Sequence, residues 1–84
     1  MPVYFFHVKH RDAVDDDLEG MSFDDLDQAK SSAAITLREV VAGNLRAARQ
    51  IDISGIDITD PTGKVVATVT MGDAVISVLG QKIN

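Results

Sequence analysis

The stretch Val3–Lys9, with the sequence VYFFHVK, decides the fold and contains three of the four aromatic residues of the chain. Side chains alternate along a strand, so Tyr4 and Phe6 face one way while Phe5 and His7 face the other. A strand that is apolar on both sides is typical of the middle of a sheet with both faces covered. The stretch therefore predicts a central strand and raises the question of what covers each of its faces.

The composition of the chain defines a broad class of protein. Its 84 residues predict one domain, residues 1–84, with a small core of its own. The chain has no cysteine, so neither disulfides nor thiolate metal sites contribute to its stability. It shows no secretory signal and no apolar run of about 18 residues, so we expect a cytoplasmic protein that does not enter a membrane.

The net charge of −5 is concentrated in the first part of the chain. An acidic protein lacks the phosphate-neutralising surface that general binding to nucleic acid requires, and it is repelled by anionic membrane surfaces. We therefore expect no nucleic-acid and no membrane partner, whereas a basic protein partner is an alternative. The acids that form the candidate surface for such a partner are Asp15, Asp16, Asp17, Glu19 and Asp24.

A long helix is predicted after the first acidic stretch. Ser22 is a suitable N-cap, and Asp25 occupies the acidic position of a capping box. A helix that continues to about residue 50 would be roughly 39 Å long and would overhang the sheet. The alternative is that it ends at the Gly43-Asn44 pair, which is a common terminator. Apolar residues recur along it at steps of three and four: Leu26, Ala29, Ala33, Leu37, Val40, Val41, Leu45 and Ala48.

A β-hairpin is predicted in the second half of the chain. The parity of the apolar residues changes at Ser54-Gly55, which indicates a bulge or a strand start, and we place the regular strand at Gly55–Asp60. The sequence Asp60-Pro61-Thr62-Gly63 is a strong turn signal. The chain then returns as a strand over Lys64–Thr70.

Two short segments complete the predicted fold. A short strand is expected around Ala13–Leu18, and Gly72–Leu79 is expected to form either a short helix or a strand. The element order is β-(β)-α-β-β, which predicts a two-layer α+β domain. In it, one long helix lies across one face of an antiparallel sheet.

The sequence gives little support for a catalytic or metal site. There is no cysteine, no serine lies in a nucleophile-elbow motif, and no glycine-rich phosphate loop is present, so we expect neither an enzyme nor a cofactor. His7 and His10 lie near Asp12 and the run Asp15–Asp17, which suggests a divalent metal site. The two histidines have opposite parity on the predicted strand, so their spacing does not bring them together, and we predict no metal.

Four short motifs together resemble a family of small bacterial domains of unknown function. They are Tyr4-Phe5-Phe6-His7, Asp16-Asp17-x-Glu19-Gly20, Asp25-Leu26-x-x-Ala29 and Thr59-Asp60-x-x-Gly63-x-Val65-Val66. The resemblance extends to about Val69. It implies a compact α+β unit, and it implies no established activity, cofactor or site residue.

Three functional hypotheses follow. The leading one is a non-enzymatic interaction domain that forms a homodimer through spare apolar surface. The second is an acidic regulatory module that binds a basic protein partner, and the third is a metal- or small-ligand-binding domain that uses His7 or His10. The candidate interface residues are Tyr4, Phe6, Leu45, Val75, Ile76 and Leu79.

Overall fold

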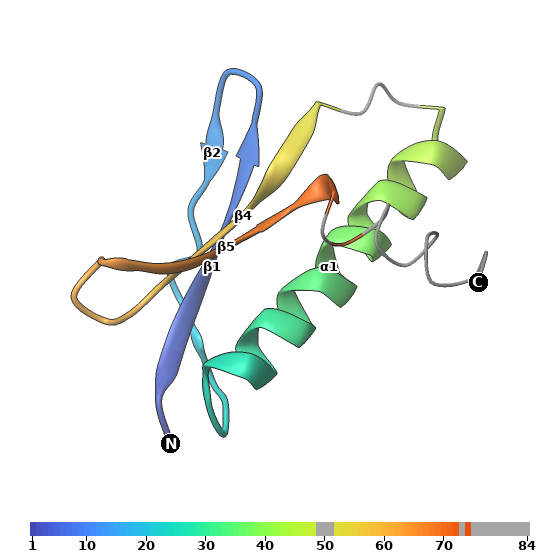
Figure 1. Cartoon of the computed structure of the whole chain (residues 1–84). Coiled ribbons are helices and arrows are strands. Elements are labelled where there is room, and N and C mark those ends of the chain that lie inside the picture. Colours follow the sequence, from blue (N-terminus) through green and yellow to red (C-terminus); the bar gives the residue numbers. More distant parts are fainter. Residues whose placement is uncertain (49–51, 73, 75–84) are drawn as a thin grey trace.

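The computed structural model describes residues 1–48, 52–72 and 74, and these form one long helix and five strands (Figure 1). The strand pairs are antiparallel, and the helix lies across one face of the sheet. The predicted two-layer α+β fold is therefore confirmed. The elements are β1 (Val3–His10), β2 (Val14–Asp15), β3 (Met21–Ser22), α1 (Leu26–Arg46), β4 (Ile53–Thr59) and β5 (Val65–Thr70).

Strand β1 lies inside the sheet, as its apolar faces predict. The strand order is β2-β1-β4-β5, and β3 also pairs with β1. β4 pairs with β1 from Phe5↔Thr59 to His10↔Ile53, and β5 pairs with β4 on its far side. β5 is consequently an edge strand of the sheet among the described residues.

The strand predicted around Ala13–Leu18 is shorter than expected and is followed by another. β2 pairs with Val8 and Lys9 near the end of β1, and β3 pairs with Val3 and Tyr4 at its start. Between them the chain leaves the ladder and turns at Gly20, whose φ is +72°. A Cβ at Gly20 would lie 2.7 Å from the Phe5 ring, so this loop covers the side of β1 that faces away from α1.

Helix α1 begins later than predicted. Ser22 belongs to β3, and the N-cap is Asp25, whose Oδ1 accepts a hydrogen bond of 2.9 Å from the Gln28 amide. The prediction of Ser22 as the cap was wrong because the preceding residues are held in the sheet. The Phe23 amide donates to the Pro2 carbonyl, and the Phe23 ring is buried.

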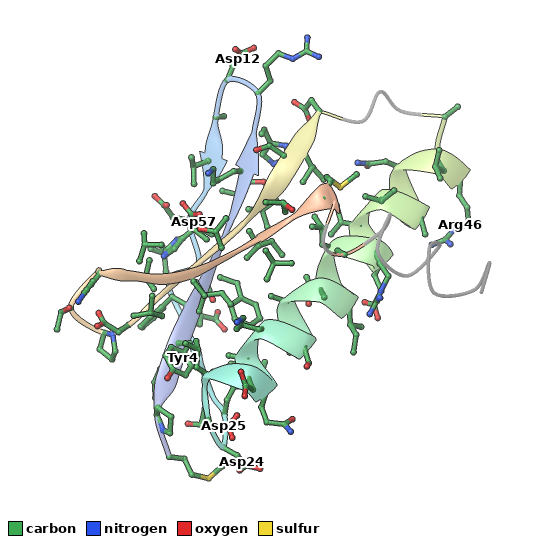
Figure 2. The ribbon with its side chains drawn as sticks, viewed as in Figure 1. Tyr4, Asp12, Asp24, Asp25, Arg46 and Asp57 are labelled. Atoms are coloured by element: carbon green, nitrogen blue, oxygen red, sulfur yellow. The ribbon has the colours of Figure 1, made fainter. Side chains whose placement is uncertain are left out.

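The helix runs through the Gly43-Asn44 pair and ends at Arg46, so the alternative of an end at this pair does not occur. Its last turn is closed by Ala47, whose amide donates to the Gly43 carbonyl, and Ala48 adopts a left-handed φ of +56°. Figure 2 shows Asp24 and Asp25 at one end of α1 and Arg46 at the other, which is the favourable orientation for the helix dipole.

The β4–β5 hairpin confirms the predicted turn, and the pairing of β4 with β1 shows that the parity change at Ser54-Gly55 is a bulge. Lys9 pairs with Gly55 and His10 with Ile53, so Ser54 is an extra residue that returns Ile53 to the core face. β4 therefore starts at Ile53, two residues before the predicted start at Gly55. In the turn, the Asp60 carboxylate accepts hydrogen bonds from the Thr62 and Lys64 amides.

The core lies between α1 and the sheet. Its largest fully buried side chains are Leu37 of α1 and Ile56 and Ile58 of β4. The even-numbered side chains of β1 share this face, and the Phe6 ring stacks on Phe23 with 5.4 Å between centroids. The layer that covers the first strand on one side is therefore the helix together with Phe23.

The described part of the C-terminal segment is helical at Met71, Gly72 and Ala74. The remainder of the predicted element Gly72–Leu79 lies outside the described residues. In the ranges that the structure describes, the helices lack the length and apolar character needed to cross a membrane.

Candidate functional site

The sheet face that points away from α1 carries polar side chains joined across three strands. Lys9 Nζ of β1 lies 3.6 Å from Asp57 Oδ1 of β4, which in turn accepts a hydrogen bond of 2.8 Å from the Thr68 hydroxyl of β5. Figure 2 shows Asp57 on this side of the sheet. These pairs tie the strands together, and they leave this face polar beyond the Phe5 ring and its covering loop.

His7 and Thr59 on the same face approximate a base and a nucleophile. His7 Nε2 lies 2.9 Å from Thr59 Oγ1, and Asp16 Oδ1 lies 3.3 Å from Nδ1 on the other side of the ring. A Thr-His-Asp arrangement of this kind would need the hydrogen on Nδ1 and a free Nε2 to accept the hydroxyl proton.

The hydrogen-bond network favours the opposite tautomer of His7. The Asp17 amide donates to Nδ1 at 3.2 Å, so we assign the ring hydrogen to Nε2, from which it is donated to the Thr59 hydroxyl. In this tautomer the ring cannot accept the Thr59 proton, and the Thr59 residue is only 6% exposed. The arrangement is suited to joining β1, β4 and the loop after β2.

Asp17 occupies the gap in the ladder between β2 and β3. Its carboxylate accepts hydrogen bonds from the amides of Phe6, Glu19 and Gly20 at 3.1, 3.1 and 3.3 Å. Partial burial raises the pKa of Asp17, but these three amides outweigh it and hold the pKa below its ordinary value. The Phe6 amide on the open side of β1 thus gains a side-chain partner where no strand reaches it.

We expect replacement of Asp17 by asparagine to lower the free energy of unfolding by about 1 kcal/mol at neutral pH, after allowance for its partial exposure. The amide group of asparagine can present an acceptor to Phe6 or to the loop amides, but not to both. Since the pKa of Asp17 is lowered in the folded state, its contribution is present above the unfolded pKa of about 4. The contribution is lost as the pH falls through the folded pKa, so the two proteins should converge in acid.

Urea unfolding at several pH values measures this effect. The matched control is Asp16→Asn, because Asp16 is exposed and faces a ring nitrogen that bears no hydrogen in the assigned tautomer. We expect its free energy of unfolding to change by less than about 0.5 kcal/mol. Equal losses in the two variants would contradict the role given to Asp17.

His10 joins the β1–β2 hairpin to the residue that precedes β4. Its Nε2 lies 2.8 Å from Asp15 Oδ2, and its Nδ1 lies 3.0 Å from Asp52 Oδ1. The hydrogen bonds to Asp52 and then to Asp15 raise the pKa of His10, and the His10 ring lowers the pKa of Asp52 in turn. His10 is therefore held between two carboxylates near the tip of the hairpin, where Figure 2 shows Asp12.

The structure does not bring the two histidines together. His7 bonds to Thr59 on the face away from α1, and both nitrogens of His10 are occupied by carboxylates at a separate position. Among the described residues, no group of three or more potential ligands could hold a metal ion. The arrangement thus offers no support for the metal hypothesis.

The acids of the predicted acidic surface have different environments. Asp15 pairs with His10, and Asp17 binds three amides, so these two carboxylates stabilise the fold. Asp16, Glu19 and Asp24 are exposed, and Asp16 also lies 3.3 Å from Nδ1 of His7.

The candidate interface residues also differ in their exposure to solvent. Tyr4 and Phe6 pack against the core, because even-numbered residues of β1 face α1, and this leaves both side chains partly buried. Leu45 is 65% exposed at the end of α1. Val75, Ile76 and Leu79 lie outside the described residues.

The two edges of the sheet are built differently. Beside β1, the strands β2 and β3 have two residues each, and Asp17 binds the exposed Phe6 amide. β5 has the sequence VVATVT, which includes neither a charge nor a proline. A bulge at Val66 bends its first part, and the pairing with β4 is regular from Ala67 to Thr70. In residues 1–48, 52–72 and 74, no further strand pairs with its outer side.

A groove of about 450 Å³ lies beside this edge, between β5 and the first half of α1. We define the β5 edge as the outer side of Val65–Val69, and the edge groove as the space lined by the following residues. They are Lys30, Ser31 and Ala34 from α1, and Thr68 and Val69 from β5. The groove combines apolar surface, the Ser31 hydroxyl group and the Lys30 ammonium group next to strand backbone.

The sequence analysis did not identify the residues that form the β5 edge and the edge groove. Lys30 and Thr68 belong to separate elements, and only the packing of α1 on β5 places them at one groove. The uncharged run Val65–Thr70 was visible in the sequence, but its position at an edge depends on the strand order. A hydrophobic six-residue strand without charge or proline is the signal that could have drawn attention to it.

Comparison with known proteins adds the family. Residues 3–72 match the family described as "Domain of unknown function (DUF6894)", which confirms the resemblance carried by the four motifs. No curated protein and no solved structure matches the chain.

Proposed function

Since the chain belongs to the DUF6894 family of domains of unknown function, we propose its function from its geometry: it is a small non-enzymatic protein-interaction domain. Its binding surface is the β5 edge, to which an extended polypeptide segment adds as a further strand. The observation that carries this proposal is the contrast between the two edges of the sheet, one blocked by Asp17 and one uncharged.

An uncharged edge strand is unusual unless it serves to bind another chain. Natural sheets protect their edges with charges, prolines, bulges or very short strands, because exposed backbone groups recruit other chains. β5 has one such device, the bulge at Val66, and it leaves Ala67–Thr70 regular. A strand added beside Ala67–Val69 would gain main-chain hydrogen bonds, and the edge groove would receive its side chains.

A binding role also accords with the polar face of the sheet. The tautomer assigned to His7 turns its hydrogen toward Thr59, so the most catalysis-like arrangement lacks a free base. The hydroxyl of Thr59 lies in a nearly buried residue. Both observations favour structural over catalytic roles for these side chains.

The proposal is tested with a six-residue peptide of alternating threonine and valine, titrated into isotope-labelled protein and followed by NMR. We expect the amide signals of Val65–Thr70 and of Lys30 and Ser31 to shift. Replacement of Thr68 by lysine should weaken binding at least about tenfold, because a charged edge strand resists pairing. The new lysine lies beside Asp57, so the fold is expected to be retained.

The matched control for this variant is Met21→Lys, which places the same charge on β3 at the opposite edge, where Met21 is 64% exposed. It should leave the peptide affinity unchanged. Equal weakening by the two variants, or shifts confined to residues far from β5, would contradict the proposal.

A further inference from the structure

We propose that the segment bound at the β5 edge is an extended stretch of another protein that carries a carboxylate, and that Lys30 binds this carboxylate. This inference rests on the proposed function and names the chemical class of its partner. It is carried by the position of Lys30 in the edge groove and by the lack of an acidic partner for Lys30 among the described residues.

Lys30 stands where a side chain of an added strand would point. The edge groove is continuous with β5, since Thr68 and Val69 form one of its walls. The other wall is one flank of α1, on which Lys30 and Ala34 lie one helical turn apart. Successive side chains of a strand alternate between the two faces of a sheet, so every second side chain of the added strand would enter this groove.

The ammonium group of Lys30 has no acidic partner among residues 1–48, 52–72 and 74. Two other basic side chains are engaged: Lys9 of β1 pairs with Asp57, and Arg38 of α1 donates to the Ala74 carbonyl. An isolated lysine beside a groove, in a chain whose net charge is −5, is complementary to a carboxylate brought by a partner. The hydroxyl group of Ser31 is a further donor in the same groove, whereas the Thr68 hydroxyl donates to Asp57 on the opposite face of the sheet.

A second copy of the chain is a less suitable occupant of the β5 edge than a strand that carries a carboxylate. The regular part of β5 runs from Ala67 to Thr70, so antiparallel pairing of two copies would place the two-fold axis near Thr68 and Val69. These residues also line the edge groove, and the axis would bring Lys30 of each copy toward the other. Like charges opposed in this way are unfavourable, whereas a carboxylate is favourable.

Three peptides test the inference. They share the threonine–valine pattern and differ at one central position, which is glutamate, glutamine or lysine. For the unmodified protein, we expect the glutamate peptide to bind about threefold to fivefold more tightly than the glutamine peptide, and the lysine peptide to bind most weakly. This difference should shrink at high salt.

Substitution of Lys30 by glutamate should reverse the order of the three affinities. Arg11→Glu changes the net charge equally at the tip of the β1–β2 hairpin, and it should preserve the order. Circular dichroism of each variant establishes that the helix is retained.

Three outcomes would overturn the inference. If all three peptides shift the β5 signals with equal affinity, Lys30 does not select a carboxylate, although the proposed function stands. If no peptide shifts them, both proposals fail. If light scattering shows a dimer that Thr68→Lys dissociates and Met21→Lys does not, a second copy occupies the edge.

Discussion

Replacement of Leu37 by alanine is expected to lower the free energy of unfolding by about 3 kcal/mol. Leu37 is fully buried between α1 and the sheet, in the same cluster as Ile56 and Ile58. The substitution removes the transfer free energy of the side chain and leaves a cavity between two layers that cannot fully close. A domain of this size has a total stability of only about 4 to 12 kcal/mol, so the loss is a large fraction of it.

Urea or thermal unfolding monitored by circular dichroism measures this loss. Ile35→Ala is the matched control, because it truncates an aliphatic side chain of the same helix that is 50% exposed. We expect the control to change the free energy of unfolding by less than about 1 kcal/mol. Similar losses for the two variants would contradict the assignment of the buried face of α1.

The second large effect is expected at Gly55 of β4. A Cβ added there would lie 2.5 Å from the Val69 carbonyl oxygen, which belongs to the backbone of the neighbouring strand β5. The contact cannot be relieved by a side-chain rotation, so β5 must move away from β4. We expect Gly55→Ala to lower the free energy of unfolding by about 2 to 3 kcal/mol.

Gly43→Ala is the natural control for this variant. Gly43 lies inside α1, and a Cβ there would have no neighbouring atom within 4 Å. Alanine favours the helix over glycine by about 0.5 to 1 kcal/mol, so this variant should be more stable than the unmodified protein. Chemical denaturation should show that the free energy of unfolding falls for Gly55→Ala and rises for Gly43→Ala. A Gly55→Ala protein as stable as the unmodified one would contradict the close approach of β4 and β5.

Much of the fold could be predicted because local signals agreed with one another. The two-faced apolar pattern of Val3–Lys9 predicted a central strand, and the apolar repeat through Leu37 predicted the long helix. The parity change at Ser54-Gly55 predicted the irregularity that the structure shows as an extra residue at Ser54. Each of these signals depends on residues close in the chain, which is why sequence alone reveals them.

The remaining features depend on contacts between distant segments. Ser22 has the chemistry of an N-cap, but pairing with Val3 of β1 draws it into β3 and leaves the cap to Asp25. Asp17 looked like one of several surface acids, and only the gap beside Phe6 gives it its amide partners. Helix patterning could not show that Gly43-Asn44 would continue α1.

The candidate site was the least predictable part for the same reason. An uncharged strand is ordinary in the middle of a sheet and becomes a binding surface only at an edge. The strand order that places β5 there arises from the pairing of β1 with β4, whose sequences carry no information on which strand lies outermost. The edge groove adds Lys30, which comes from a helix that crosses the sheet.

Amide hydrogen exchange of the protein without added peptide tests most directly the claim that the β5 edge is open. In an edge strand of an antiparallel sheet, alternate N–H groups point to solvent and the others bond to the neighbouring strand. We predict fast exchange at alternate amides within Val65–Val69 and slow exchange at the amides of Ile56 and Ile58 in β4. Uniformly slow exchange along Val65–Val69 without added peptide would contradict the account, because it would mean that the edge is already covered.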